Sequence, residues 1–447
     1  MDPKIFKSYD VRGTYPTSIN EEIAEKIGMA FVNNFKLKKA AIGRDGRISS
    51  PQIEKAITSG IKKAGADVVK LGIICTDMLY FASAYYDDID GGANITASHN
   101  PKDDNGFKFI LKGAVAVSGE KGGYAMRDLI QEGKLEESSK EGKEEERDVY
   151  KDYTKKLQSL IDVFKIKPLK VVVDAGNGVG CYIFEKVISG LPIKMVPLYG
   201  EIDGNFPNHQ PSPIEEKNLV DLQKKVVEEK ADLGMTFDGD GDRVYLVDEK
   251  GAIINATVMM AMIAKRMLDR KPGARILYNV NVGWIVPEII KKNGGVSSIT
   301  PVGHSLIKAQ MRKEDGYFAG EHSGHYFFKD LYYADSGMLA SLIMLELISI
   351  ENKTLSEIAK VYDIYSLSGE INSEVADPKA KIAEIKKQYS DGKISEMDGL
   401  SVEYPDWRFI LRPSNTEPLL RLNVEAKSKE LMEQKRDKVV ALIEKQK

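Results

Sequence analysis

Ala231-Asp-Leu-Gly-Met-Thr-Phe-Asp238 has the pattern of a short buried strand that runs into a polar, glycine-bearing loop. Three other segments share this pattern: Ala40–Asp45, Leu169–Asp174 and Ala274–Asn279. Helical periodicity is found in four stretches: Ile53–Ala64, Leu219–Lys230, Val258–Leu268 and Met338–Leu347. Short buried strands that alternate with helices predict parallel α/β units. Ligands of such sheets gather at the loops after the carboxyl ends of the strands, so these loops are the first candidates for chemistry.

The length of 447 residues suggests roughly three domains, at about 150 residues per domain. A charged stretch, Glu132–Asp148, is expected to be a solvated helix or linker that ends the first domain, rather than a functional acidic patch. After Tyr362 the pattern changes: Trp407–Arg412 has the composition of a strand, and Glu425–Lys447 has amphipathic helical spacing. The sequence therefore predicts four parts, the last a smaller α+β unit: residues 1–147, 148–250, 251–364 and 365–447.

Charge and composition exclude several classes of protein. The chain has 64 Lys and Arg against 67 Asp and Glu, whereas proteins that bind nucleic acid as their main partner present clearly basic surfaces. Two cysteines, Cys75 and Cys181, are too few for a disulfide framework and fit a reducing cytosol. The first residues lack the apolar run of a secretory signal, and the longest apolar stretch, Gly337–Ile350, is shorter than the ~20 residues that span a bilayer. We expect a cytoplasmic protein with no membrane or nucleic-acid partner.

Three carboxylates occupy alternate positions in Asp238-Gly-Asp240-Gly-Asp242-Arg243. The glycines allow the backbone to fold back tightly, so that the three side chains can converge on one hard cation such as Mg²⁺. An EF-hand calcium loop also begins with alternating acids, but it needs glycine at its sixth position, where this chain has Arg243. Like charges at this spacing repel without a counterion, so a metal site is favoured over an acidic surface turn. Arg243 would offset charge or contact a phosphate.

Small and polar residues surround Ser98 in Thr96-Ala-Ser-His-Asn-Pro101, and Asp104-Asn-Gly-Phe-Lys108 follows. The Gly-x-Ser-x-Gly pattern of a serine hydrolase is absent from the sequence. A serine that carries phosphate fits better with three carboxylates elsewhere, because a phosphoserine oxygen could complete the coordination of Mg²⁺. From spacing alone, a capping or turn role for Ser98, His99 and Asn100 is an equally good interpretation.

Several motifs stand in the order found in the α-D-phosphohexomutases: Thr96–Pro101, Asp238–Arg243, Gly320-Glu-His-Ser-Gly-His325 and Arg412-Pro-Ser-Asn-Thr-Glu417. Tyr9-Asp-Val-Arg-Gly13 and Asn205-Phe-Pro-Asn-His209 match as well. The chain resembles this superfamily over essentially its whole length, and within it the phosphomannomutase/phosphoglucomutase branch. The resemblance implies an α/β fold of three similar domains with mixed, largely parallel sheets, plus a smaller C-terminal α+β domain, arranged around a central active-site cleft.

The resemblance also implies a reaction. In the family, the serine that matches Ser98 is phosphorylated and transfers its phosphoryl group to the sugar. This phosphoserine would hold Mg²⁺ together with Asp238, Asp240 and Asp242. The implied activity interconverts the 1-phosphate and 6-phosphate of mannose and/or glucose through a hexose 1,6-bisphosphate, which also serves as activator.

Further residues are implied by matching positions. Lys108, His304 and His325 are the candidates for the general acid/base, and the choice among them stays open; Arg12 and Arg243 are implied as electrostatic partners. A cluster of cations would lower the pKa of Lys108 or of a histidine into a useful range. The residues implied for substrate binding are Tyr9, Glu321, Ser323, His325 and Lys308, and those for the non-transferring phosphate are Arg412, Ser414, Asn415, Thr416 and Arg421.

Two positions depart from the family pattern. Asn281 stands where relatives often have a lysine near the substrate, and Thr76-Asp77 stands where many have Thr-Pro. The first departure would alter phosphate affinity or substrate preference, and neither removes the core chemistry. The sequence does not distinguish a monomer from a dimer, and it does not rank glucose, mannose and glucosamine phosphates.

Three alternative functions are weighed against this interpretation. A phosphoglucosamine mutase matches less well, because that branch usually has Gln in the sugar loop where this chain has His322. A sugar-phosphate-binding protein without activity would not need Ser98, three aspartates and Lys108. A dinucleotide-binding oxidoreductase is suggested by Gly176-Asn-Gly178 after a strand, but Cys181 stands at the third glycine position of that fingerprint.

Overall fold

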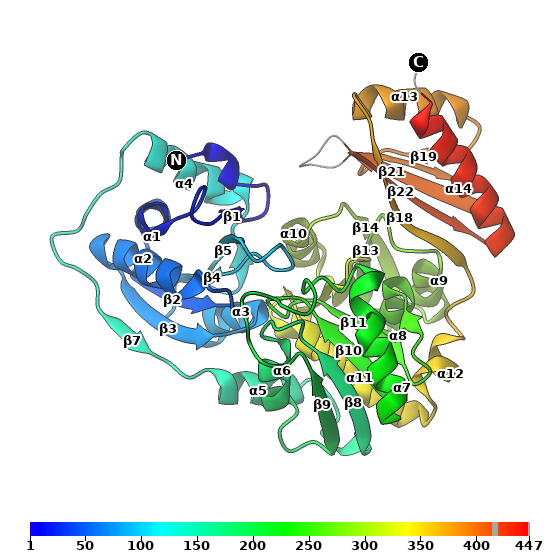
Figure 1. Cartoon of the computed structure of the whole chain (residues 1–447), viewed down its shortest axis with the longest axis horizontal. Coiled ribbons are helices and arrows are strands. Elements are labelled where there is room, and N and C mark those ends of the chain that lie inside the picture. The colour runs from blue at the N-terminus through cyan, green and yellow to red at the C-terminus, as the bar shows by residue number, and fades with distance from the viewer. Residues whose placement is uncertain (414–418, 446–447) are drawn as a thin grey trace. The chain divides into compact units, whose positions relative to one another are not determined.

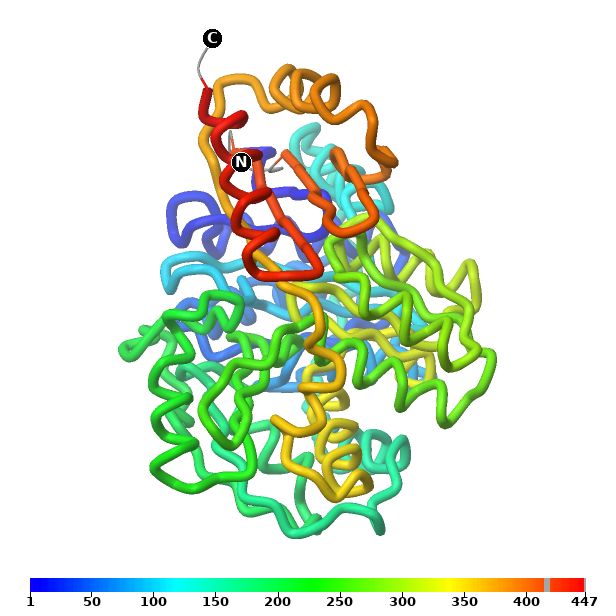
Figure 2. The backbone as a smooth tube through the Cα atoms, turned by 90° about the vertical axis from the view of Figure 1, so that its right-hand side faces the viewer, coloured from blue at the N-terminus to red at the C-terminus, as the bar shows by residue number. Residues whose placement is uncertain are grey.

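The computed structural model describes residues 1–413 and 419–445. Its backbone separates into two compact units, which are described one at a time: Met1–Asn255 with Ser323–Ser356, and Ala256–His322 with Glu357–Lys447. Figure 1 labels the helices and strands, and Figure 2 follows the chain from its blue N-terminus to its red C-terminus.

The first sheet of the first unit is mixed. Its strands are β1 (Val11–Thr14), β2 (Lys39–Arg44), β3 (Asp67–Ile73), β4 (Gly91–Ile95), β5 (Asp104–Leu111), β6 (Val115–Ala116) and β7 (Glu144–Glu146). They lie in the order β1-β5-β4-β2-β3-β7, with β6 beside β5. β2 runs parallel to β3 and β4, whereas β5 is antiparallel to β4 and β1. The carboxyl end of β4 and the start of β5 therefore enclose the loop that contains Ser98.

Six helical segments belong to this sheet: η1 (Pro3–Ile5), α1 (Glu21–Phe35), α2 (Ser50–Lys63), α3 (Thr76–Tyr85), η2 (Gly119–Gly123) and α4 (Tyr124–Gln131). Asn20 starts α1, since its Oδ1 accepts a hydrogen bond from the Ile23 amide at 3.0 Å. α1 and α2 lie side by side in Figure 1, and a Cβ at Gly60 would lie 1.9 Å from the Glu25 carbonyl oxygen. Glycine is therefore needed at this crossing.

The charged stretch Glu132–Asp148 contains a strand that its composition did not predict. β7 pairs in parallel with β3 and is exposed throughout. It consists of three glutamates, and such charged residues at a sheet edge discourage pairing with another chain. These three residues extend the first sheet, while the rest of the stretch is irregular and links α4 to the segment that follows, as expected for a linker.

The second sheet of this unit carries the acidic loop. It consists of β8 (Leu169–Asp174), β9 (Ile193–Leu198), β10 (Leu233–Phe237), β11 (Val244–Asp248) and β12 (Ile253–Ile254), in the order β12-β11-β10-β8-β9. β8 is parallel to β9 and β10, and β10 and β11 form an antiparallel pair. The accompanying helices are α5 (Tyr150–Gln158), η3 (Val163–Lys165), α6 (Gly180–Val187), η4 (Glu216–Leu219) and α7 (Val220–Glu229).

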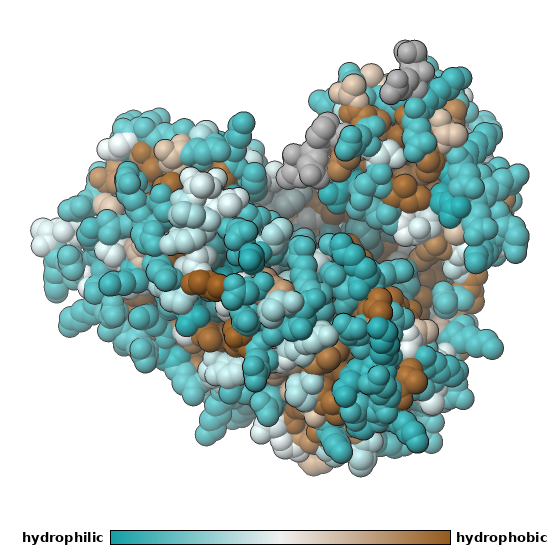
Figure 3. Space-filling view, viewed as in Figure 1, coloured by the Kyte–Doolittle hydropathy of each residue, from teal (hydrophilic) through white to brown (hydrophobic). Residues whose placement is uncertain are grey.

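The first unit ends with β16 (Tyr326–Phe328), η5 (Lys329–Leu331), β17 (Ala334–Asp335) and α11 (Gly337–Glu351). α11 is buried almost throughout, and its only acid before the last residue, Glu346, accepts a hydrogen bond from the Asp162 amide at 2.7 Å. Among the described residues, no helix combines the length and the hydrophobicity that crossing a bilayer requires. The face drawn in Figure 3 is mainly hydrophilic, with separate apolar residues.

The second unit begins with a parallel arrangement. Its elements are α8 (Ala256–Arg270), β13 (Arg275–Asn279), α9 (Ile285–Lys292), β14 (Val296–Thr300), α10 (His304–Glu314) and β15 (Phe318–Gly320). β13 lies between β14 and β15 and runs parallel to both. α12 (Leu355–Ala359) includes the last residues of the first unit's range and the residues at which the second unit's range resumes.

A smaller antiparallel sheet completes the second unit. Its strands are β18 (Ser366–Glu374), β19 (Lys393–Ser395), β20 (Leu400–Glu403), β21 (Trp407–Pro413) and β22 (Leu419–Ala426), in the order β18-β22-β21-β20-β19. α13 (Pro378–Gln388) and α14 (Lys429–Glu444) lie beside it, orange and red in Figures 1 and 2. The predicted α/β fold with a smaller C-terminal α+β part is confirmed, while the exact boundaries after residues 147, 250 and 364 stay predictions.

Candidate active site

The acidic loop joins two paired strands, β10 and β11, with Phe237 opposite Val244 at their ends. The carboxylates of Asp238, Asp240 and Asp242 are buried, and one oxygen from each lies within 4.8 Å of the others. Gly241 has φ of 70°, a left-handed conformation that glycine adopts at little cost. The three side chains converge, as their spacing predicts.

A lysine from the first sheet bridges two of these carboxylates. Lys108 lies on β5, and its Nζ donates to Oδ2 of Asp240 at 2.7 Å and to Oδ2 of Asp242 at 2.6 Å. Burial alone would lower the pKa of this ammonium group, but the two carboxylates outweigh burial and raise the pKa well above its ordinary value. The expectation that neighbouring cations lower the pKa of Lys108 is wrong, because its closest charged neighbours are acids.

The remaining oxygens of the loop suit a divalent cation. Among the described residues, Oδ1 of Asp240 and Oδ1 of Asp242 are buried and have no hydrogen-bond partner. Burial and the two neighbouring carboxylates raise the pKa of Asp238 well above its ordinary range, so one lysine does not relieve the repulsion. Mg²⁺ prefers oxygen ligands from carboxylates and would satisfy both unpartnered atoms. The residues therefore fit the metal that the sequence suggests.

Thr76 supports the acidic loop from the first turn of α3. Its amide donates to the Asp240 carbonyl at 3.0 Å, and its hydroxyl donates to Asp240 Oδ2 at 2.5 Å. Although burial alone would raise the pKa of Asp240, Lys108 and Thr76 hold it below its ordinary value. Sequence reasoning noted this position only as a departure from a family pattern, since nothing in a threonine that starts a helix indicates a contact 164 residues away.

Asp77 connects three segments directly behind Thr76. Its buried carboxylate accepts hydrogen bonds from Cys75 Sγ at 2.7 Å, from the Tyr153 hydroxyl at 2.5 Å and from the Ser336 hydroxyl. Burial raises the pKa of Asp77 to about 6. Tyr153 belongs to α5, and Ser336 caps α11, so this carboxylate joins the starts of two helices to α3.

Ser98 lies at the edge of the acidic cluster. Its Oγ is 2.7 Å from Asp238 Oδ2, to which it donates, and 3.1 Å from Nδ1 of His99. The Ser98 amide donates to Thr96 Oγ1 at 2.8 Å. Ser98 has φ of 51°, a left-handed conformation that is unfavourable for a residue with a side chain. The structure thus brings together the predicted nucleophile and the predicted metal ligands.

Two arginines and a histidine surround this serine. Arg12 donates to Asn100 Oδ1 at 2.7 Å and to Asp10 Oδ2 at 2.5 Å. The Arg243 amide donates to Asp238 Oδ1 at 3.2 Å, and its Nε lies 3.5 Å from Oδ2 of the same residue. Burial, followed by the charges of Arg243 and Arg12, lowers the pKa of His99 well below its ordinary value. The imidazole beside Ser98 is therefore neutral at pH 7.

His325 also reaches the acidic loop. Its Nδ1 lies 2.8 Å from Oδ2 of the buried Asp335 and 3.7 Å from Oδ1 of Asp242. Backbone pairing between His325 and Arg243 fixes this approach. Ser323 stands two residues earlier in the same loop, and Tyr9 lies in the turn before β1, where both are partly buried.

The Asn205–His209 motif supports the serine loop from the second sheet. Nε2 of His209 lies 3.0 Å from Oδ2 of Asp174, at the end of β8. The next residue, Gln210, donates from its side chain to the His99 carbonyl at 2.6 Å. The Gly176-Asn-Gly178 turn packs against the acidic loop, since a Cβ at Gly178 would lie 2.9 Å from Cα of Gly239.

The other predicted residues belong to the second unit. Glu321 and His322 follow β15, and Nδ1 of His322 lies 3.3 Å from Nδ2 of Asn279. His304 is the first residue of α10, and the buried Lys308 follows one turn later, so both lie on one side of that helix. The amide nitrogen and oxygen of the Asn281 side chain are buried and have no hydrogen-bond partner among the described residues.

Two predicted phosphate-binding arginines lie opposite each other on paired strands. Arg412 on β21 faces Arg421 on β22, a like-charge pair that needs negative partners. Arg412 Nε lies 3.1 Å from Asp398 Oδ1, and Arg421 Nη1 lies 3.2 Å from Glu370 Oε1. Ser414, Asn415 and Thr416 lie outside the described residues.

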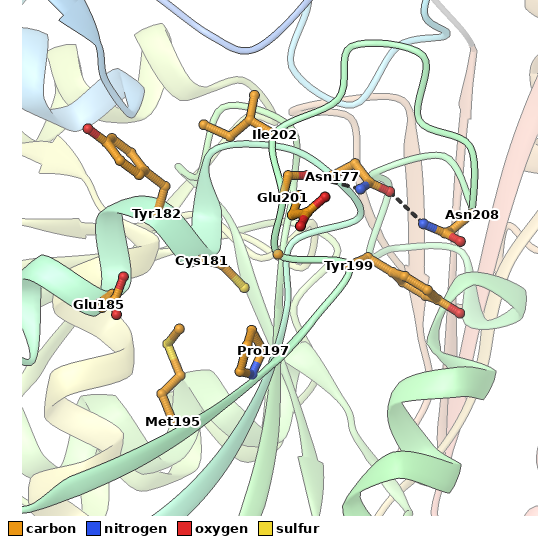
Figure 4. A pocket seen from close by; sticks show the side chains of 11 residues that line it. Asn177, Cys181, Tyr182, Glu185, Met195, Pro197, Tyr199, Glu201, Ile202 and Asn208 are labelled. Atoms are coloured by element: carbon orange, nitrogen blue, oxygen red, sulfur yellow. Dashed lines mark hydrogen bonds between the residues drawn. The ribbon is translucent and has the colours of Figure 1, made fainter.

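A separate hollow of about 840 Å³ lies beside α6 and β9. Figure 4 shows Cys181, Tyr182, Met195 and Pro197 along it, with the Asn208 amide donating to Asn177 Oδ1 at 2.8 Å on one side. None of the predicted catalytic or metal-binding residues lines it. This hollow is therefore separate from the cluster formed by Ser98, Lys108 and the acidic loop.

Comparison with known families identifies all four parts of the chain. The descriptions phosphoglucomutase/phosphomannomutase alpha/beta/alpha domain I, domain II and domain III match residues 3–133, 150–251 and 255–365, respectively. The phosphoglucomutase/phosphomannomutase C-terminal domain matches residues 370–442.

Individual relatives are similar over almost the whole chain. A phosphomannomutase from Methanocaldococcus jannaschii is 37% identical over 450 residues, which cover 99% of this chain and 98% of the relative. A phosphomannomutase from Escherichia coli is 36% identical over 450 residues, with 98% of each chain covered. A crystal structure of a phosphoglucomutase/phosphomannomutase family protein from Burkholderia thailandensis superimposes with a TM-score of 0.91 at 33% identity, covering 99% of this chain and 98% of the other.

Proposed function

This chain belongs to the phosphoglucomutase/phosphomannomutase family, and we propose that it interconverts hexose 1-phosphate and hexose 6-phosphate through a phosphoserine at Ser98. The observation that carries this proposal is the 2.7 Å contact between Ser98 Oγ and a carboxylate of the buried acidic loop. A serine hydroxyl in this position can accept a phosphoryl group and return it while the acids hold a cation.

The phosphoryl group moves twice in the proposed cycle. Phosphoserine 98 donates its phosphoryl group to the free hydroxyl of the sugar phosphate, which gives hexose 1,6-bisphosphate and an unmodified serine. The bisphosphate turns around and returns its other phosphoryl group to Ser98 Oγ. The enzyme is phosphorylated again at the end, so the net change is an isomerisation.

Asp238, Asp240 and Asp242 would hold Mg²⁺ together with the phosphoserine. When bound, the cation would draw electron density from the phosphoryl group and neutralise its charge. Lys108 and Arg243 lie against the same carboxylates, and Arg12 contacts Asn100 of the serine loop. These cations suit the non-bridging oxygens of the group in transfer.

Proton transfer to and from the sugar hydroxyl needs a group within hydrogen-bond reach. Lys108 is held as an ammonium ion by two carboxylates, which raise its pKa well above the ordinary value, so it is suited to a fixed positive charge and poorly suited to proton transfer. His325 is oriented by Asp335 and is the candidate base within the first unit. His304 remains the candidate from the second unit.

Further residues are proposed to recognise the substrate. A carboxylate and a hydroxyl, from Glu321 and Ser323, can hold two vicinal hydroxyls of a hexose, with Tyr9, Lys308 and His325 as further contacts. The cross-strand pair Arg412 and Arg421 suits the non-transferring phosphate, together with Ser414, Asn415 and Thr416. A grip on vicinal hydroxyls away from C2 would accept both glucose and mannose, and the relatives named phosphomannomutase support mannose phosphate as one substrate.

The test combines mass and turnover. Intact-protein mass spectrometry should detect one added phosphate after incubation with hexose 1,6-bisphosphate and Mg²⁺, and peptide mapping should place it on Ser98. When this phosphate is radiolabelled, the label should pass to the sugar on addition of unlabelled hexose 1-phosphate. Turnover is then compared on glucose, mannose and glucosamine 1-phosphates with the bisphosphate present. No phosphoserine and no turnover would indicate a binding protein, and a strong preference for the amino sugar would indicate a phosphoglucosamine mutase.

A further inference from the structure

One buried arginine contacts the serine loop more extensively than any residue discussed above. Arg47 lies between β2 and α2, and its side chain is 0% exposed. Nη1 donates to the carbonyls of Pro101 at 2.6 Å and Asp104 at 2.9 Å. Nη2 donates to the carbonyls of Ser98 and Asn100, both at 2.8 Å. Four hydrogen bonds from one side chain therefore end on the backbone between residues 98 and 104.

The fifth donor of this guanidinium is also used. Nε donates to Asp45 Oδ2 at 3.1 Å, and Asp45 in turn accepts from the Arg47 amide and from the Ser50 hydroxyl. All five N–H groups of the side chain thus have a partner. A lysine offers three donors from a single nitrogen, so it cannot reach carbonyls on both sides of the planar group.

A second motif covers the guanidinium. The ring of Phe206, in the Asn205–His209 motif, lies with its centroid 5.2 Å from Cζ of Arg47. The backbone of the two loops approaches closely, since a Cβ at Gly204 would lie 2.4 Å from the Ile48 amide nitrogen. The aromatic face therefore favours the cation and covers it with apolar surface.

The serine loop needs such support because its conformation is strained. Ser98 is in the left-handed region, which a residue with a Cβ occupies only when the surroundings enforce it. Arg47 fixes the Ser98 carbonyl, Thr96 fixes the Ser98 amide, and Gln210 fixes the His99 carbonyl. With both flanking peptide groups held, Oγ is directed at Asp238.

We propose that Arg47 is a positioning residue for phosphoryl transfer, which holds the left-handed backbone of Ser98 through four carbonyls and is covered by Phe206. This inference rests on the proposed role of Ser98. Arg47 contacts the backbone of the nucleophile loop and acts through Ser98, not on the sugar. Its loss should therefore slow the transfer of phosphate and leave the affinity for the sugar phosphate nearly unchanged.

Arg47→Lys is the primary variant. We expect kcat to fall about 100-fold with KM within about threefold of the unmodified enzyme, because small misplacement of a nucleophile has effects of this size. In a single turnover with hexose 1,6-bisphosphate, phosphate should appear on Ser98 more slowly by the same factor. Arg44→Lys is the matched control. Arg44 is the last residue of β2, three residues before Arg47, and pairs with Glu54 at 3.1 Å, so its replacement by lysine should leave kcat unchanged.

Chemical rescue distinguishes positioning from general loss of structure. Added guanidinium or ethylguanidinium should raise the kcat of the Arg47→Ala variant at least tenfold, whereas ethylammonium should not raise it. Should Arg47→Ala fail to fold, Phe206→Leu provides the second measurement: it keeps the arginine, and kcat should fall severalfold with KM unchanged.

Several results would overturn the inference. Wild-type kcat in Arg47→Lys, equal rescue by ethylammonium, or a loss confined to KM each contradict a positioning role. Failure of the proposed function itself would give a different result, because the wild-type protein would then carry no phosphate on Ser98 under any condition. The role of Arg47 alone would be refuted if the wild-type protein is phosphorylated at Ser98 and the Arg47→Lys variant is phosphorylated at the same rate.

Discussion

The acidic loop and the serine loop perform one task but are positioned in different ways. The acidic loop is short, lies between two paired strands and uses glycine at its left-handed position. The serine loop has a left-handed serine instead, and its backbone is held by side chains from distant segments: Arg47 from before α2, and Gln210 from the segment between β9 and η4. One loop is shaped mainly by its own residues, the other mainly by its surroundings.

This difference shows where each loop is vulnerable. A change of an aspartate or of the left-handed Gly241 in the acidic loop should alter metal binding directly, because these residues are the expected ligands and the turn that brings them together. The serine loop has a single reacting atom, so most changes around it should alter the rate and not the affinity for ligands. The following predictions test that division, from the largest expected effect to the smallest.

Replacement of the reacting atom should have the largest effect. Ser98→Ala removes Oγ and the 2.7 Å contact with Asp238, so mutase turnover should fall by at least about 10⁴-fold. The three aspartates remain, so the affinity for Mg²⁺ measured by calorimetry should change by less than about tenfold. A variant with more than one tenth of the normal turnover would contradict the assignment of the nucleophile.

Asp240→Asn tests the acidic loop itself. The change removes the charge that pairs with Lys108 and one expected metal ligand, so we expect Mg²⁺ affinity and kcat both to fall at least about 100-fold. Chelation of metal from the unmodified enzyme should abolish turnover, and added Mg²⁺ should restore it. Asp248→Asn, at the other end of β11, is the matched control and should leave Mg²⁺ affinity unchanged. Equal effects of the two variants would mean that the acidic loop is not the metal site.

The same division explains how much the sequence alone predicts. The strands and helices with clear periodicity were predicted, and so was the convergence of three aspartates, because glycine turns and residue spacing are local properties. β7 was not predicted, because three glutamates have no strand pattern and the strand exists only through its pairing with β3. Thr76 and Arg47 were not assigned to the site either, because the partner of Thr76 in the acidic loop lies 164 residues away and the partners of Arg47 in the serine loop lie at least 51 residues away.

Lys108 illustrates a different kind of error. The motif that contains Lys108 was recognised from the sequence, but its charged neighbours were expected to be the arginines Arg12 and Arg243. The two carboxylates that contact it come from another sheet, and they reverse the direction of its pKa shift. The sign of a buried electrostatic effect therefore depends on contacts that the sequence does not contain.

Two glycines of the acidic loop allow a direct test of the comparison. In Gly239→Ala the new Cβ would lie 2.5 Å from the Ser98 carbonyl oxygen and push the serine loop away. We expect kcat to fall about 10- to 100-fold with Mg²⁺ affinity nearly unchanged.

Gly241→Ala is its counterpart in the same loop. It places a side chain at φ of 70° and 3.1 Å from Cβ of Cys75, so it strains the acidic turn itself. Here Mg²⁺ affinity should fall first, and excess Mg²⁺ should restore much of the turnover. If Gly239→Ala and Gly241→Ala lost Mg²⁺ affinity and kcat in the same proportion, the proposed difference between the two loops would be wrong.

Asp77 supports the acidic loop indirectly, because it anchors the helix from which Thr76 reaches Asp240. Burial raises the pKa of Asp77 to about 6, from an ordinary value of 3.8 in the unfolded chain. Between these values the folded protein binds more protons than the unfolded chain at this site. The contribution of Asp77 to stability is therefore fully present below about pH 4 and is lost as the pH rises through about 6, by about 3 kcal/mol in all.

Asp77→Asn removes this dependence, because an amide does not titrate. The amide has one acceptor oxygen in place of the two that receive the Cys75, Tyr153 and Ser336 donors, so the variant should be less stable by an offset that does not vary with pH. Only the wild-type protein also loses stability through Asp77 as the pH rises. The difference in thermal unfolding midpoint between wild type and variant should therefore narrow from pH 4 to pH 7. Turnover at 25 °C should change less than in the variants of Ser98, Asp240, Gly239 and Gly241, since Asp77 contacts neither loop. A gap that stays constant or widens with pH would mean that Asp77 is ionised in the folded protein throughout this range, and that α3 is held by a charge and not by a carboxyl group that releases its proton near pH 6.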